Sequence, residues 1–127
     1  MKANELRIGN YIWLKCHHFP VKVEGIFRGV DGPIWIETDL HEGEKIEDFE
    51  PIPLTEEWFY KLGFQSYGHI YTLHFESGFA LSYNTSLKSW FLSIHSTTTT
   101  AIRDFKYVHE IQKFYYAATG KDVVIRA

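Results

Sequence analysis

The 127-residue chain has one cysteine, no apolar run near the roughly 20 residues that cross a bilayer, and no glycine-rich phosphate-binding motif. A single cysteine excludes an internal disulfide framework and favours a cytoplasmic setting. The first seven residues lack the apolar segment of a signal peptide. These absences predict a cytoplasmic protein without a membrane-spanning segment and without the usual cradle for a nucleotide phosphate.

Motifs that carry catalysis or bind metals are equally scarce. No G-x-S-x-G turn is present, and a zincin helix beginning at His109 would need a second histidine where Lys113 stands. Cys16, His17 and His18 are consecutive, so on a strand they point to opposite faces and cannot all bind one ion. Alternation also places Cys16 in the core, where a thiol is inert. We therefore predict no catalytic site, no metal site and no cofactor.

Negative charge is concentrated in the stretch 37–50. Six Lys/Arg and ten Asp/Glu give residues 1–53 a net charge of −4. Seven of these acids lie in the stretch, where only one lysine opposes them: Glu37, Asp39, Glu42, Glu44, Glu47, Asp48 and Glu50 face Lys45. We interpret the stretch as a solvated loop, because the residue spacing of a calcium-binding loop is absent. Such a surface would repel phosphate, which disfavours nucleic acid as a partner.

The residues that are present predict a folded α+β protein. With 45% hydrophobic and 17% aromatic residues, the chain has enough apolar surface for a core. Alternating segments at 11–16, 20–28 and 34–37, with a fourth near 46–49, predict a small SH3-like β-barrel lobe over 1–53. Pro51 and Pro53 end this lobe.

The second lobe, 54–127, is predicted to be an antiparallel meander covered on one face by two helices. Strands at 71–75, 79–83 and 90–94 align three rows of large apolar side chains: Tyr71–Tyr83–Trp90, Leu73–Leu81–Leu92 and Phe75–Phe79–Ile94. The first helix begins after Thr55 and ends before Gly63, and the second runs from about 106 to 119. We expect a β-prone loop or edge at 96–100 and a last strand at 122–125.

One candidate binding surface lies on the predicted outer face of the first lobe. It combines aromatic and basic side chains: Tyr11, Trp13 and Trp35 with Lys15, Lys22 and Arg28. Burial of this face by the second lobe or a partner subunit is the interpretation we favour, since large aromatics rarely stay open. The alternative is a binding surface like those of peptide-binding barrels and stacking-based nucleic-acid readers.

Three segments together carry a resemblance: Glu5–Tyr11, the segment from Pro51 to Trp58 with Leu62–Phe64, and the C-terminal helix from Tyr107 to Gly120. In this order they resemble segments of small uncharacterised proteins encoded in Bacteroidetes genomes and their phages, and the last is similar to a "YVHQLQNLYFALTGEEL"-like string. The resemblance implies a bacterial or prophage origin and no activity. It also draws attention to His109 and Gln112, three residues apart on one helix face, as helix–sheet hydrogen-bonding residues.

Three functional hypotheses follow. The first is a non-enzymatic binding module of phage or prophage origin that binds a protein partner or a second copy of itself. The second is a nucleic-acid-associated accessory protein that uses the same aromatic and basic face. The third, a small hydrolase, would require His74, His95 or His109 to meet carboxylates in one pocket.

Overall fold

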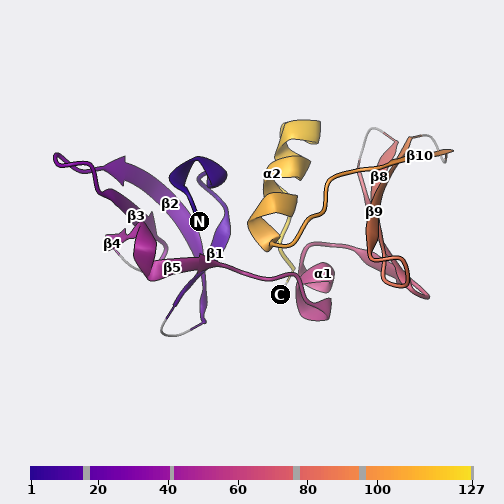
Figure 1. Cartoon of the computed structure of the whole chain (residues 1–127), viewed down its shortest axis with the longest axis horizontal. Helices are drawn as coiled ribbons and strands as arrows, with labels where there is room; N and C mark the ends of the chain where they lie inside the picture. The colour runs from indigo at the N-terminus through magenta and orange to yellow at the C-terminus, as the bar shows by residue number, and fades with distance from the viewer. Residues whose placement is uncertain (16–17, 41, 76–77, 95–96, 127) are drawn as a thin grey trace. The chain divides into compact units, whose positions relative to one another are not determined.

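The computed structural model describes residues 1–15, 18–40, 42–75, 78–94 and 97–126, with 97–101 described by their backbone alone. Within these residues the chain is a mixed α and β protein with two five-stranded antiparallel sheets and two α-helices (Figure 1). It divides into a first unit, residues 1–53 with 107–113, and a second unit, 54–106 with 114–127. The division after Pro53 falls at the predicted lobe boundary. The C-terminal helix, predicted wholly within the second lobe, contributes residues to both units.

The first unit is built on one antiparallel sheet. Its elements are the 3₁₀ turn Ala3–Glu5, β1 (Tyr11–Leu14), β2 (Pro20–Arg28), β3 (Ile34–Thr38), β4 (Glu44–Lys45), the 3₁₀ turn Ile46–Asp48 and β5 (Phe49–Pro51). The strand order is β4-β3-β2-β1-β5, so the last strand returns to pair with the first. No closed barrel is found among the described residues, and the SH3-like barrel stays a prediction.

Alternation along β1 sorts the side chains as predicted. Ile12 and Leu14 of β1 are buried, whereas Tyr11 and Trp13 are only half-buried. The core is completed by residues from the neighbouring elements: Leu6, Val21, Val23, Ile36, Ile46 and Phe49. The fourth strand predicted near 46–49 is wrong in detail, because residues 46–48 form the 3₁₀ turn. Pro51 is accommodated in β5 because that strand lies at the sheet edge, where a missing N–H costs nothing.

The second unit contains the meander. Its strands are β6 (Gln65–Tyr67), β7 (Ile70–His74), β8 (Phe79–Asn84), β9 (Ser89–Ile94) and β10 (Thr97–Ala101), in the order β10-β9-β8-β7-β6. The predicted register is confirmed. Tyr83 lies opposite both Tyr71 and Trp90, and Leu81 lies opposite both Leu73 and Leu92. The threonine-rich segment forms the edge strand β10, as expected, and β6 adds a strand that the pattern did not indicate.

Two helices complete the structure: α1 (Glu56–Lys61) and α2 (Val108–Thr119). The Thr55 side chain accepts a hydrogen bond from the Trp58 N–H at 3.3 Å, which confirms the predicted N-cap. Phe59 of α1 stacks on Tyr71 at 4.4 Å between ring centroids, so this helix covers the apolar face of the meander. Within the second unit, the C-terminal part of α2 packs on the same sheet through Tyr115, which meets Phe75 edge-on at 5.1 Å.

The strand predicted at 122–125 is wrong. These residues are irregular, and beyond them the Arg126 N–H donates to the Lys61 carbonyl at 2.7 Å. The segment thus supplies a donor to the Lys61 carbonyl, which, like the other carbonyls at the end of a helix, has no N–H donor within the helix itself. No helix among the described residues has the length and apolar character needed to cross a membrane.

Candidate functional site

Trp13 is partly covered by its own unit. It lies opposite Pro20 on β2 and opposite Glu50 on β5. The ring of His18, a residue with a positive φ of 49°, stacks on it at 4.9 Å. His18 Nε2 is in turn 2.8 Å from a Glu50 carboxylate oxygen. The Trp13 indole Nε1 is buried and has no hydrogen-bond partner among the residues that the structure describes.

Trp35 lies in a more open setting. It pairs with Phe27 on β2 and with Lys45 on β4, so all three side chains share one face of the sheet. Phe27 is 55% exposed and Trp35 is 36% exposed. The Lys45 ammonium lies 5.9 Å from the centroid of the Trp35 ring, within range of a cation–π interaction. We call Phe27, Trp35 and Lys45 the aromatic pair with its lysine.

A β-bulge changes which residues of β2 belong to this face. Strict alternation predicts Phe27 inward and Arg28 outward, yet the register shifts between Val23 and Gly25. One extra residue reverses the direction of every later side chain, so Phe27 is exposed and Arg28 lies opposite Ile34, which packs against the core. The prediction that Arg28 shares a face with Trp35 is therefore wrong. A glycine inside a strand pattern is the signal that could have indicated the bulge.

The other predicted site residues lie on or beside β1. Tyr11 is half-buried and sits opposite Lys22 of β2. Lys15 is exposed just after β1, and its backbone N–H donates to the Asp48 carbonyl at 3.0 Å. The register places Tyr11, Trp13, Lys22 and Trp35 on the outward side of one sheet. The face also carries Glu37 and Glu50, so its charge is mixed rather than uniformly basic.

Gln112 links the first part of α2 to the start of β1 inside the first unit. It is 4% exposed, its Oε1 accepts from the Tyr11 N–H at 2.8 Å, and its Nε2 donates to the Gly9 carbonyl at 3.1 Å. The helix–sheet hydrogen-bonding role expected of Gln112 is confirmed. Asn10, which sequence reasoning missed, is fully buried beside it and accepts the Arg7 N–H through Oδ1 at 2.8 Å.

No catalytic arrangement of histidines is found among the described residues. His109 is 2% exposed, its Nδ1 has no hydrogen-bond partner among the described residues, and burial lowers the pKa of its imidazole. His74 is exposed on β7 of the second unit, while His109 belongs to the first. Cys16, His17 and His95 lie outside the described residues. Within the described part of the chain, no three His, Cys, Asp or Glu side chains could hold a metal ion together.

The comparisons with known proteins do not assign the chain to a family. No family model matches it, and neither a curated protein nor a solved structure matches it.

Proposed function

We propose that the chain is a non-enzymatic protein-interaction module whose first unit is an SH3-like barrel. Two features of the unit support the barrel. The last strand returns to the first in the order β4-β3-β2-β1-β5, and a 3₁₀ turn directly precedes the returning strand. The bulge between Val23 and Gly25 supplies the bend that a small curved sheet needs. On the resemblance described above, we also propose a phage or prophage origin in Bacteroidetes and a cytoplasmic location.

The aromatic pair with its lysine carries the binding proposal. Phe27 and Trp35 are large, open and directly opposite each other on neighbouring strands. A Cβ atom on Gly25 would lie 2.7 Å from the Phe27 ring, so the absence of a side chain there lets the ring lie across β2. Exposed aromatic residues of this kind are enriched in protein interfaces, because their side chains contribute a large contact area and lose little conformational entropy on binding.

We infer that the partner presents an extended, proline-containing segment with basic residues. Proline-rich segments dock on aromatic grooves because they are already extended before binding. The stretch 37–50, with seven acids against one lysine, follows Trp35 directly in the chain. Opposite charge on the ligand would speed its encounter with this surface and discriminate against acidic partners. Glu37 shares the face of Trp35, which brings one of these acids to the proposed surface.

A binding titration tests this function. A synthetic peptide rich in proline and arginine is titrated into the ¹⁵N-labelled full chain, and amide and indole resonances are followed. We expect shifts at Phe27 and Trp35, and an affinity at least tenfold lower for Trp35→Ala, as for a hot-spot residue. Tyr67→Ala is the matched control, because Tyr67 is an exposed aromatic (57%) in the second unit.

Three outcomes would overturn the proposal. The first is equal binding of a peptide in which glutamate replaces arginine. The second is preferred binding of a thymidine oligonucleotide with a steep salt dependence, which favours the nucleic-acid alternative through Lys15 and Lys22. The third is a wild-type dimer that Trp35→Ala dissociates, measured by analytical ultracentrifugation, which identifies a second copy as the occupant of the surface.

A further inference from the structure

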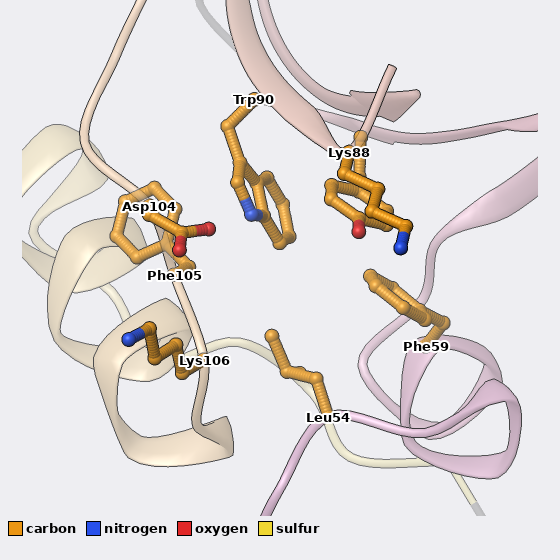
Figure 2. A pocket seen from close by; sticks show the side chains of 8 residues that line it. Leu54, Phe59, Lys88, Trp90, Asp104, Phe105 and Lys106 are labelled. Atoms are coloured by element: carbon orange, nitrogen blue, oxygen red, sulfur yellow. The ribbon is translucent and has the colours of Figure 1, made fainter. Parts of the chain in front are cut away.

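The two faces of the meander differ in what they leave open. On the inner face, where Leu73 and Leu81 are buried, the rings of Phe59, Trp90 and Phe105 line a cavity (Figure 2). These rings pack on one another, since the Trp90 centroid is 6.0 Å from that of Phe59 and 5.1 Å from that of Phe105. Each of the three residues is 6% exposed or less, so the inner face offers no ring to a ligand. The accessible face of the meander is the outer one.

The strands β6 to β10 contain no Asp, Glu, Lys or Arg. Between Lys61 and Arg103 the sequence has only two such residues, Glu76 and Lys88. Lys88 lies in the turn between β8 and β9, and Glu76 lies outside the described residues. An average domain is about one-quarter charged, and the solvated face of an antiparallel sheet ordinarily carries its polar residues. An open face without charge suits a ligand without charge, because nothing on it would replace the water lost by an ionic group.

Hydroxyl groups lie at the centre of the outer face. Thr72 of β7 is directly opposite Ser82 of β8, and their side-chain oxygens are 3.0 Å apart. Ser93 of β9 lies opposite Ala80, which alternation places on the same face as Ser82. One hydroxyl of the Thr72–Ser82 pair donates to the other, which leaves the second O–H of the pair to a ligand. All three hydroxyl residues are partly exposed, so a ligand can reach them.

Two pockets meet at these hydroxyl groups. Ser82 and Ser93 line both of them. The smaller pocket, of about 250 Å³, is bordered by apolar side chains: Ile70, Leu87 and Phe91. The larger pocket, of about 550 Å³, extends to Thr72 and His74. Together they form a groove on the outer face that is apolar at one end and supplies hydrogen-bonding groups at the other.

The apolar end of the groove is accessible. Leu87 is 65% exposed, and Ile70 and Phe91 are partly exposed. Tyr67 of β6, which is 57% exposed, lies opposite Ile70 and extends this end of the groove. Asn84 lies opposite Ile70 on β8, and its Oδ1 accepts from two N–H groups of the following turn at 3.0 and 3.1 Å. The amide N–H groups of Asn84 are thereby left to a ligand.

We propose that this groove binds a neutral oligosaccharide. A sugar ring has C–H groups that pack on apolar side chains and on the weakly negative face of an aromatic ring, and hydroxyls that both donate and accept hydrogen bonds. Its C–H groups would lie on Ile70 and Phe91, and its hydroxyls would meet Ser82 and Asn84. The larger pocket, toward His74, would take the next sugar unit. The proposal concerns the second unit alone and does not depend on the function proposed for the first.

A second copy of the chain fits this face less well than a sugar does. The centre of the face consists of hydroxyl groups, whereas the buried centre of a dimer interface is mostly apolar. Hydroxyls buried against a second copy would each need a partner, and the uncharged, apolar and hydroxyl residues of that copy would supply few.

Titrations with three neutral trisaccharides test the site: maltotriose, cellotriose and N,N′,N″-triacetylchitotriose. Backbone amide resonances of the ¹⁵N-labelled full chain are followed. We expect at least one of the three to shift the resonances of Ser82, Asn84 and Phe91 with a Kd below about 1 mM. Trigalacturonic acid, which carries a carboxylate on each ring, is the charged counterpart and should bind about tenfold more weakly.

Calorimetry on variants then separates the contacts. Phe91→Ala should weaken binding of the tightest trisaccharide about tenfold, and Ser82→Ala, which removes the hydroxyl shared by both pockets, about fivefold. Tyr60→Ala is the matched control for the ring, because Tyr60 is 58% exposed on α1, which covers the inner face. Ser66→Ala is the control for the hydroxyl, because Ser66 is exposed opposite Tyr71 on the inner side. Neither control should change the affinity.

The proposal is overturned if none of the three trisaccharides shifts these resonances with a Kd below about 1 mM, or if trigalacturonic acid binds as tightly as they do. It is also overturned if Tyr60→Ala weakens binding as much as Phe91→Ala. A wild-type dimer that Phe91→Ala dissociates in analytical ultracentrifugation would identify a second copy as the occupant of the face instead. Should Phe91→Ala fail to fold, as judged by circular dichroism, the wild-type shifts and the Ser82→Ala affinity still decide.

Discussion

The hydrogen bonds of Gln112 allow a quantitative test of how α2 is held to the first unit. Replacing Gln112 by leucine keeps most of the side-chain volume and removes both the acceptor and the donor of its amide. The Tyr11 N–H and the Gly9 carbonyl then lose the partners that the structure records at 2.8 and 3.1 Å. Water cannot replace them easily, because Gln112 is only 4% exposed.

The expected loss follows from these two groups. Leaving a buried backbone group unpaired costs about 1–3 kcal/mol, so losing the partners of both groups in Gln112→Leu should lower the free energy of unfolding by about 2–6 kcal/mol. This is a large share of the roughly 5–15 kcal/mol that stabilises a typical domain. For a chain of 127 residues each kcal/mol corresponds to a fall in Tm of about 4 °C.

Urea unfolding followed by circular dichroism and tryptophan fluorescence measures this loss. Gln65→Leu is the control, because Gln65 is exposed on β6, where substitution should change stability by less than about 0.5 kcal/mol. A Gln112→Leu effect no larger than that of Gln65→Leu would refute the reasoning. It would mean that the two backbone groups find other partners at no cost.

Two further predictions concern single residues. Burial lowers the pKa of His109 in the folded chain. Below the ordinary histidine pKa of about 6.5 the unfolded chain therefore binds a proton that the folded chain does not, and the free energy of unfolding decreases as the pH is lowered. His109→Gln should reduce this fall between about pH 7 and pH 5 in urea unfolding, and an unchanged slope would contradict the assignment. Gly63 has a φ of +94°, so Gly63→Ala should cost about 1 kcal/mol in the same assay. Gly43→Ala, at an open position without a positive φ, should be nearly neutral, and equal effects would show that backbone strain is not the cause.

Local patterns were sufficient for much of the second unit. Thr55 caps α1 and Gly63 ends it because both act through neighbouring backbone groups. The register of β7, β8 and β9 follows from a period of two, since a slip of one residue would expose the apolar row that includes Leu81. The strand predicted at 122–125 is wrong because an apolar run does not specify a neighbouring strand to pair with. Just beyond it, the Arg126 N–H donates to the Lys61 carbonyl instead.

The candidate site of the first unit shows the limit of such patterns. Alternation placed Tyr11 and Trp13 outward, where the structure also has them, but it could not count the extra residue at the β2 bulge. Phe27 consequently lies on the face where Arg28 was predicted, opposite Trp35. Lys45 of β4 lies on the other side of Trp35, with its ammonium near the Trp35 ring. A bulge depends on pairing with another strand, so its effect on later side chains is decided by the sheet.

The sequence by itself determined the absence of the familiar catalytic and phosphate-binding motifs, the excess of aromatic residues, both helices and the central strands of the meander. Only the tertiary structure decided which aromatics are open and which enclose a cavity. Trp35 and Trp90 have the same side chain, yet Trp35 is 36% exposed, whereas Trp90 is 2% exposed and its indole N–H has no hydrogen-bond partner in the described part of the chain. The difference arises because exposure and hydrogen-bond satisfaction depend on neighbours distant in the chain, which local periodicity does not encode.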